Sequence, residues 1–322
     1  MKKYIGIDIG GMTIKGIIID RKGEVYCQGN IVTGWQNGGE GMCRNIRELT
    51  EDMMKRGNIS REEISGVGVG CPGMIDSKNG VVVFAGNLNL HNFPLAETLE
   101  KYLGFKVKIT NDANAAALGE AKFGAGKDYR DSILITLGTG VGGGIIIDGK
   151  LFEGFKSAGA EMGHMVIVEG GEGCTCGRQG CFEAYSSATA LMKKTREVMQ
   201  NNPESAMWRG YNLETVSGKT PFDYPEDKAA NEIIDWYVKY LACGICNLAN
   251  IFRPQVVMLG GGVSEQGERL TKPLQARVDA QIFGGTKFAP VKVVKATLGS
   301  RAGAFGAATL AFSLRSQTAS KN

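Results

Sequence analysis

Four residues with soft donor atoms lie close together near the middle of the chain. His164, Cys174, Cys176 and Cys181 follow the spacing H-x9-C-x-C-x4-C within EMGHMVIVEGGEGCTCGRQGCFE. Three thiolates and one imidazole complete a closed tetrahedral Zn²⁺ shell, and the intervening glycines let a short loop wrap around the ion. Because such a shell has no open position, the sequence predicts a structural zinc site. The competing interpretation is three buried thiols beside an unrelated histidine.

Two carboxylates flank this loop. Glu161 precedes it and Glu183 follows it. If the loop folds around zinc, both acids and the edge of His164 come together, an arrangement that suits a polyhydroxylated ligand whose hydroxyls donate to charged acceptors. In the simpler interpretation, Glu183 is a charge at a helix N-terminus and Glu161 is solvated.

A glycine-rich turn near the start of the chain could bind phosphate. The strand YIGIDIGG carries Asp8 and ends in Gly10 and Gly11, and Thr13 follows in the turn. Such a turn presents consecutive backbone N–H groups, and a carboxylate at the strand end suits a hydrated Mg²⁺ ion. Taken alone, the segment is better explained as a glycine-rich hairpin without a ligand.

The same pattern returns later in the chain. IGIDIGGMTIKGIIID and LITLGTGVGGGIIID superimpose at one offset, 128 residues, which aligns Gly16 with Gly144. A duplicated strand, turn and strand explains a match of this length better than chance. The second turn consists of Gly138, Thr139 and Gly140, so that a hydroxyl joins the backbone donors. We expect the two turns to hold one polyphosphate from both sides.

A third glycine cluster, LGGGVSEQG, follows the apolar strand QVVML and precedes a helix. Gly260, Gly261 and Gly262 would let a flat nucleoside approach the backbone at that strand end. Glycine-rich turns between strand and helix are common in α/β proteins, so this cluster gains weight only as the third of three.

Asn111 and Asp112, in TNDANAAA, come directly after the strand KVKIT and before a helix. An Asp at this place commonly caps the helix. It also fits the carboxylate that a kinase acting on an alcohol needs to accept the hydroxyl proton. This segment alone leaves both interpretations open.

The chain as a whole alternates β-runs with amphipathic helices, which is typical of α/β proteins with mixed sheets. Strands are expected at residues 4–9, 14–20, 66–71, 106–110, 132–137, 143–149 and 255–260. Helices are expected at residues 40–56, 94–103, 112–123, 182–200, 227–252, 264–279 and 302–314.

Composition narrows the class of protein. The 322 residues carry a net charge of +4 with the basic residues spread along the chain, so nothing indicates a nucleic-acid or membrane surface. The N-terminus lacks the pattern of a signal peptide or a transmembrane helix, which predicts a cytoplasmic protein. Of the remaining cysteines, Cys243 and Cys246 share one face of an expected helix and are interpreted as small core residues.

Taken in order, DIGG, CPG at Cys71–Gly73, NDANAAALGE, LGTGVGGG, ExGH at Glu161–His164, CxCGxxGCxE at Cys174–Glu183 and LGGGVS resemble the ROK family of sugar kinases, and most of all its glucokinases. The resemblance covers residues 4–312. It implies an actin-like (ribonuclease H-like) α/β fold of two duplicated domains that close over a cleft, with ATP and Mg²⁺ on one side and a hexose on the other. It also suggests a homodimer.

The resemblance assigns roles to individual residues. Asp112 would be the catalytic base, and Asp8 would serve the Mg²⁺. Other residues would contact the sugar: Gly73, Asn87, Asn111, Glu161, His164 and Glu183. A further set would contact the nucleotide, with Gly10, Gly11, Thr13, Gly138, Thr139 and Gly140 at the phosphates and Gly260, Gly261 and Gly262 at the adenosine. His164 would give one ring nitrogen to zinc and the other to the sugar side.

Two departures from the family pattern bear on affinity and specificity. Met12 replaces the first threonine of DxGGT, which removes a hydroxyl near the phosphates, and the segment 87–92 lacks the tryptophan of many family glucokinases. The expected reaction is ATP-dependent phosphorylation of a hexose at its 6-hydroxyl, with glucose first. Fructose, mannose, allose, N-acetylmannosamine and N-acetylglucosamine remain alternatives, because epimers differ in the geometry of one hydroxyl.

A sugar-responsive regulator without catalysis is the alternative from another class. Repressors of the family carry a helix-turn-helix ahead of the first strand, where this sequence has only residues 1–3, so we expect no DNA-reading helix. We expect an N-terminal α/β domain of residues 1–113 plus 300–322 and a C-terminal domain of residues 114–299 with the zinc-binding sugar loop, because the duplicated second unit starts soon after residue 113.

Overall fold

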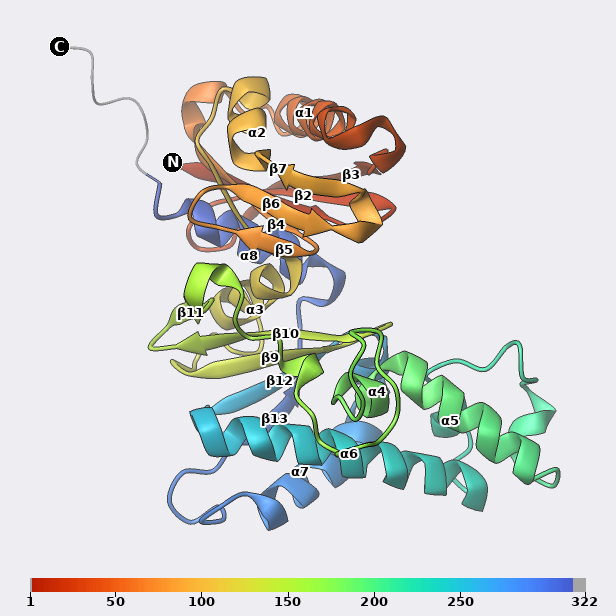
Figure 1. The fold of residues 1–322 in the computed structure, drawn as a ribbon. Coiled ribbons are helices and arrows are strands. Elements are labelled where there is room, and N and C mark those ends of the chain that lie inside the picture. Colours follow the sequence, from red (N-terminus) through yellow and green to blue (C-terminus); the bar gives the residue numbers. More distant parts are fainter. Residues whose placement is uncertain (1, 315–322) are drawn as a thin grey trace. The chain divides into compact units, whose positions relative to one another are not determined.

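The computed structural model describes residues 2–314, which divide into two compact units (Figure 1). Unit 1 comprises Met1–Arg130, Gly144–Ala160 and Thr297–Asn322, and unit 2 comprises Asp131–Gly143 and Glu161–Ala296. The expected boundary near residue 113 differs from this division, because residues 114–130 and 144–160 group with unit 1. Residues 315–322 of the expected first domain lie outside the described part of the chain.

Unit 1 is built on a five-stranded sheet in the order β3-β2-β1-β4-β8. β1 (Lys3–Ile9), β2 (Thr13–Ile19) and β3 (Val25–Val32) form an antiparallel meander. On the other side of β1, β4 (Ile64–Cys71) and β8 (Val107–Asn111) continue the sheet in parallel. A smaller antiparallel sheet joins β5 (Met74–Asp76), β6 (Val81–Ala85) and β7 (Leu90–Phe93).

The large sheet of unit 1 is covered on both faces (Figure 1). Alternation along β1 sends Ile5, Ile7 and Ile9 into the core that also contains residues of α1 (Gly38–Arg56) and α2 (Leu95–Leu103). Tyr4 points the other way, into a second core with α8 (Ala302–Ala311). Each fully buried isoleucine side chain contributes about 2 kcal/mol to the stability of the fold.

α8 lies unusually close to the sheet and to α3 (Asp112–Phe123) because glycines face its backbone. A Cβ atom added at Gly6 would overlap the carbonyl oxygen of Ala304, and one at Gly68 would overlap that of Ala307. Gly119 of α3 faces the carbonyl oxygen of Ala302 in the same way. The small residues of GAFGAATLA therefore fit this helix to a narrow space between sheet and helix.

The second sheet has the order β11-β10-β9-β12-β13. Its strands are β9 (Ser132–Leu137), β10 (Val141–Ile147), β11 (Lys150–Phe152), β12 (Val256–Gly260) and β13 (Lys292–Lys295). The boundary between the units falls within β10. Unit 2 also holds α4 (Glu183–Ser186), α5 (Ala188–Asn201), α6 (Lys228–Phe252) and α7 (Glu268–Gln281), and α7 packs against α6 and β13.

The two large sheets confirm the duplication. Each begins with a hairpin, and each places the following parallel strands beside the first strand of that hairpin, so the strand orders are equivalent. Moving β2 along the chain by 128 residues gives the bounds of β10, Val141–Ile147. The repeated sequence thus encodes the same strand, turn and strand in both halves.

The expected elements are present, and most differences have local causes. The helix expected over 182–200 is two helices, because Ser187 has an extended backbone with ψ 163 and its hydroxyl accepts a hydrogen bond from the N–H of Ala190 to start α5. α7 begins at Glu268 rather than at 264, since Gly267 has φ 56 and ends the preceding 3-10 turn η8 (Gly262–Gln266). The short or half-exposed strands β3, β5, β6, β7, β11 and β13 were not expected.

Within the described range, no helix combines the length and the apolar character that crossing a bilayer requires.

Candidate active site

The predicted zinc ligands come together in unit 2. The ligand atoms of His164, Cys174, Cys176 and Cys181 all lie within 4.8 Å of one another. The Sγ atoms of Cys176 and Cys181 are 3.7 Å apart, and Cys174 Sγ lies 3.7 Å from His164 Nδ1. Two thiolates bound to one tetrahedral zinc at about 2.3 Å are separated by about 3.8 Å. The donor set and its spacing therefore fit the ion.

The backbone of the zinc loop, residues 161–183, is ordered by its own hydrogen bonds. Val166 bridges to Cys181, and the N–H of Cys174 donates to the carbonyl of Arg178 at 2.9 Å. Gly180 has φ 79 and packs against the carbonyl of Val168, which explains the glycine before the last ligand. By contrast, Cys246 is buried and Cys243 half-buried on α6, away from this ligand group, as expected of core residues.

Glu183 links the zinc loop to the second glycine turn. Its Oε2 accepts a hydrogen bond from the N–H of Val141 at 2.9 Å, and its Oε1 accepts one from Thr175 Oγ1 at 3.3 Å. A Cβ atom added at Gly140 would overlap this carboxylate, so only glycine lets the turn pass so close. Glu183 is also the first residue of α4, as the simpler interpretation expects, and its contact with a sugar remains a prediction. Glu161 is exposed and precedes the 3-10 turn η5 (Met162–His164).

The second and third glycine clusters lie side by side in unit 2. Gly260 pairs with Thr136 in the β12–β9 ladder, which brings the ends of both strands to one edge. Gly261 has φ 82, and an added Cβ would overlap the carbonyl of Leu137. The turn at 138–140 is fixed from α5, because the N–H of Ala188 donates to the carbonyl of Gly138 at 2.8 Å. One edge of the unit 2 sheet therefore presents both predicted nucleotide segments.

The first glycine turn is fixed by Thr33, a residue that the sequence did not single out. Thr33 is fully buried; its Oγ1 donates to the carbonyl of Gly10 at 2.6 Å and its N–H donates to the carbonyl of Met12 at 2.9 Å. The N–H of Gly10 donates to the carbonyl of Thr13 at 3.0 Å. The turn is thus held from within and from the end of β3, while the Met12 side chain is 85 % exposed.

Asp8 and Asp112 form a pair of half-buried acids in unit 1. Burial raises the pKa of Asp8 to about 6; the charge of Asp112 adds to the shift, and Lys15, paired with Asp8 across β1 and β2, opposes it. Burial also raises the pKa of Asp112, against hydrogen bonds from the N–H of Ala113 and from neighbouring groups. Two nearby carboxylates with raised pKa values favour a bound cation between them, and either carboxylate can act as a proton acceptor.

Asn111 is the residue that caps α3. Its Oδ1 accepts hydrogen bonds from the N–H groups of Ala113 at 2.9 Å and Asn114 at 3.3 Å, and its Nδ2 donates to the carbonyl of Gly73 at 3.1 Å. Asp112 is the first helical residue and not the cap. The interpretation of Asp112 as the helix cap is therefore wrong, because Asn111 fills that role. Gly73, with φ 101, is brought beside Asn111.

The remaining predicted residues of unit 1 lie near the same turn. The position of a Cβ added at Gly11 lies 3.8 Å from Asn87 Nδ2, so Asn87 is beside the first glycine turn. Gly303 of α8 faces the Asp8 carboxylate so closely that a Cβ there would crowd it. No local pattern indicated Lys15, Thr33 or Gly303, because each reaches the site through contacts that only the fold creates.

The predicted site residues thus form two groups, one in each unit. Unit 1 gathers the first turn, the two acids and three of the predicted sugar contacts: Asp8, Gly10, Gly11, Thr13, Gly73, Asn87, Asn111 and Asp112. Unit 2 gathers the other two turns, the zinc ligands and the two glutamates.

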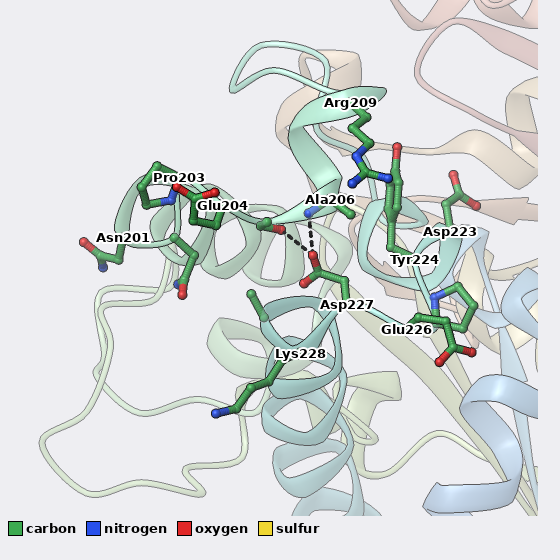
Figure 2. A pocket seen from close by; sticks show the side chains of 14 residues that line it. Asn201, Pro203, Glu204, Ala206, Arg209, Asp223, Tyr224, Glu226, Asp227 and Lys228 are labelled. Carbon is green, nitrogen blue, oxygen red and sulfur yellow. Dashed lines mark hydrogen bonds between the residues drawn. The ribbon is translucent and has the colours of Figure 1, made fainter.

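A cavity of about 690 Å³ in unit 2 contains none of these residues (Figure 2). It lies between the end of α5 and the start of α6, where Asp227 caps α6 through Ala230 and also accepts a hydrogen bond from Ser205 Oγ at 3.0 Å. Figure 2 shows the Asp227 carboxylate pointing toward Ala206, its other partner. This carboxylate is already satisfied by the protein, so the cavity adds no member to the candidate site.

Several known proteins are similar to this chain over most of its length. The chain is 38% identical over 315 residues to a glucokinase of Thermotoga maritima, covering 96% of both chains. It is 36% identical over 311 residues to a glucokinase of Halalkalibacterium halodurans, covering 94% of this chain and 93% of that protein. A xylose repressor of Caldicellulosiruptor bescii is 30% identical and is covered over 78% of its length.

Solved structures give the same result for the fold. A ROK family glucokinase from Streptomyces griseus, in complex with glucose and AMPPNP, superimposes with a TM-score of 0.79 at 34% identity, covering 96% of this chain and 98% of that one. The model of the ROK family matches residues 4–313, nearly the whole described chain. The α/β fold of two units is therefore that of the actin-like sugar kinases, and the chain belongs to the ROK family.

Proposed function

We propose that this protein is an enzyme that transfers the terminal phosphoryl group of ATP to a hexose, and that glucose, phosphorylated at its 6-hydroxyl, is its substrate. The observation that carries the proposal is the half-buried Asp112, the first residue of α3 beside Asp8, in a chain that is similar over nearly its full length to glucokinases. Because Asn111 caps the helix, the Asp112 carboxylate keeps capacity to accept a proton.

The proposed mechanism uses Asp112 as the general base. It accepts the proton of the sugar hydroxyl while that oxygen attacks the terminal phosphorus, and its raised pKa brings it nearer to the pH at which it must act. Asn87, Asn111, Glu161, His164 and Glu183, with the backbone at Gly73, orient the sugar. The main task of the protein is to hold the two reactants in line, because phosphoryl transfer gains most from positioning and charge stabilisation.

The glycine turns hold the phosphates in this proposal. The turns at Gly10, Gly11, Gly138 and Gly140, with the hydroxyls of Thr13 and Thr139, meet the charge that spreads over the transferring group. Gly260, Gly261 and Gly262 receive the adenosine. Asp8 would hold Mg²⁺, which would neutralise phosphate charge when bound: a carboxylate whose pKa is raised by burial and by Asp112 gains from a nearby cation.

Zinc has a structural role in this proposal. His164, Cys174, Cys176 and Cys181 complete its shell, and the ion fixes the orientation of His164 and, through Thr175, the neighbourhood of Glu183. We also propose a homodimer in the cytoplasm, where ATP is available; light scattering at several protein concentrations tests the dimer.

The test is an ADP-release assay with Mg·ATP and a panel of hexoses and N-acetylhexosamines, run beside Asp112→Ala. We expect turnover with glucose to exceed that with the other sugars and to fall at least about a hundredfold in the variant, while the variant still binds glucose. A preference for another sugar keeps the mechanism and changes the substrate. No turnover of any sugar by folded, zinc-containing protein refutes the enzyme and favours a sugar-responsive regulator, a class to which the xylose repressors point.

A further inference from the structure

Glu153 lies at the centre of a hydroxyl cluster that none of the motifs above includes. It follows β11, and its carboxylate accepts hydrogen bonds from Thr110 Oγ1 at 2.7 Å and from Ser77 Oγ at 3.0 Å. Ser77 Oγ in turn lies 2.6 Å from Ser157 Oγ. Thr110, Ser77, Glu153 and Ser157, hereafter the Glu153 cluster, come from three separate parts of the sequence and all belong to unit 1.

One part of the Glu153 cluster, Thr110, lies on the strand that ends directly before Asp112. Thr110 is fully buried in β8 and directly precedes Asn111 and Asp112. Its backbone is fixed by pairing with Gly70 of β4, and its hydroxyl is fixed by Glu153. A bond from a buried hydroxyl to a carboxylate is among the stronger neutral-to-charged hydrogen bonds. Glu153 therefore fixes the end of β8 at the point where the site begins.

The other arm reaches the segment that leads to Glu161. Residues 153–160 contain three non-glycine residues in the left-handed region: Lys156 with φ 53, Ser157 with φ 59 and Ala160 with φ 64. Such conformations persist only where surrounding contacts hold them. The bond between Ser77 and Ser157 holds this segment, and Ala160 is followed immediately by Glu161.

We propose that Glu153 is a positioning residue of the sugar phosphorylation reaction, acting through Thr110 on the base Asp112 and through Ser77 and Ser157 on Glu161. The inference rests on the proposed function. Glu153 itself touches neither reactant; it ties together the two segments that deliver the base and a sugar contact. A displacement of about 1 Å at such a point can cost up to about a hundredfold in rate.

Breaking the hydrogen bond to Thr110 and breaking the one to Ser77 are expected to change different kinetic constants. Thr110→Val removes the arm to β8 and lowers kcat about tenfold with little change in KM for glucose, because the base is displaced but the sugar contacts remain. Ser77→Ala removes the arm to the 153–160 segment and raises KM for glucose about fivefold with kcat largely kept. Glu153→Ala shows both changes, and KM for ATP stays within about twofold in all three, because no nucleotide segment contacts the cluster.

Two variants separate positioning from general stability. Glu153→Gln restores most of the activity, since an amide accepts from Thr110 and donates to Ser77, whose own proton can pass to Ser157. Glu40→Ala is the matched control: Glu40 accepts a 2.7 Å hydrogen bond from Tyr102 Oη elsewhere in unit 1, and its loss leaves both constants for glucose unchanged. If Glu153→Ala does not fold, Thr110→Val and Ser77→Ala still decide the matter.

The inference is overturned if Thr110→Val and Ser77→Ala both keep wild-type constants, or if KM for ATP changes as much as the constants for glucose. A loss of thermal stability in Glu153→Ala with unchanged kinetics below the unfolding temperature also overturns it. Failure of the proposed function is distinguishable, because the wild-type protein would then turn over none of the sugars. A wild-type enzyme that is active while the variants behave as wild type refutes the positioning role alone.

Discussion

Asp8 makes a contribution to the stability of the fold that depends on pH. Its pKa is about 6 in the folded protein against 3.8 for the ordinary side chain, chiefly because of burial. Between these values the folded state keeps a proton that the unfolded state has lost, so this contribution to stability is complete below about pH 4 and is lost as the pH rises through about 6. The difference amounts to about 3 kcal/mol.

We therefore expect the free energy of unfolding of the wild-type protein to contain a term that falls between pH 4 and pH 6, and we expect Asp8→Asn to remove that term. Urea unfolding at pH 5 and pH 7, without nucleotide or added Mg²⁺, measures it. Asp128→Asn, at an exposed position, is the control and keeps the wild-type slope. An identical pH slope in wild type and Asp8→Asn would contradict the burial argument.

Met12 offers a gain-of-function test at the first glycine turn. Its side chain is 85 % exposed, and the turn is held by backbone and Thr33 hydrogen bonds that do not involve the side chain. Met12→Thr therefore adds a hydroxyl without disturbing the turn. A hydrogen bond to a charged group contributes about 1.5–3 kcal/mol, so KM for ATP should fall by about tenfold or more while KM for glucose stays constant. Unchanged KM for ATP would show that this position does not meet the phosphates.

At the scale of elements, the zinc loop is the segment most dependent on a bound group. Its residues 161–183 contain no α-helix or extended strand before α4, only turns, two isolated bridges and the ligand cluster. If zinc is bound as proposed, its loss would remove the bonds that hold the four ligand side chains together, and three thiolates left together would repel one another. The neighbouring Glu183 and Gly140 would lose their fixed positions as well.

We expect one zinc per chain by elemental analysis, and we expect Cys176→Ser to lose it. The metal-free variant should show a KM for glucose raised about tenfold or more and faster proteolysis within residues 161–183. Cys27→Ser, outside the ligand group, is the control and keeps the zinc. Full zinc occupancy in Cys176→Ser, or unchanged sugar affinity in protein shown to be metal-free, would contradict the role assigned to the loop.

Local sequence signals predicted the elements that depend on local interactions. Strands β1, β2, β9 and β10 follow from apolar runs around glycine turns, and α3 follows from its cap at Asn111. β13, only four residues long and flanked by lysines, is defined by pairing with β12, a partner distant in sequence, and so carries little signal of its own. The cluster of His164 and three cysteines was predictable because its spacing is short. Thr33 and Glu153 were not, because Thr33 bonds to Gly10, 23 residues away, and Glu153 bonds to Thr110, 43 residues away.

At the scale of the whole molecule, the chain passes between the two units four times, at residues 130, 143, 160 and 296. The last return is fixed by Glu120, a fully buried residue of α3. Its carboxylate accepts hydrogen bonds from the N–H groups of Leu298 at 2.7 Å, Ala125 at 2.9 Å and Thr297 at 3.1 Å. One side chain thus joins the middle of unit 1 to the segment that brings α8 back.

Glu120→Ala should lower the free energy of unfolding by about 4 kcal/mol, because it leaves three backbone donors without their acceptor and a cavity in place of the side chain. Glu120→Gln keeps one acceptor oxygen and the volume of the side chain, so it should lower the free energy of unfolding by less than Glu120→Ala does. Urea unfolding followed by circular dichroism measures both, with Glu97→Ala on the exposed face of α2 as the control. A loss below about 1 kcal/mol in Glu120→Ala would contradict this account.

The close fit of α8 has a consequence for synthesis. α8 packs against β1, β4 and α3, which all lie before residue 124 in the chain. The ribosome therefore makes them well before α8, which begins only at Ala302. At about 5–20 residues per second, the nascent chain waits about 10–40 s for its last helix. During that time the glycine-lined face of the first sheet has no cover, so the growing polypeptide exposes apolar surface that chaperones recognise. We therefore expect translation speed and chaperone supply to affect the yield of this protein.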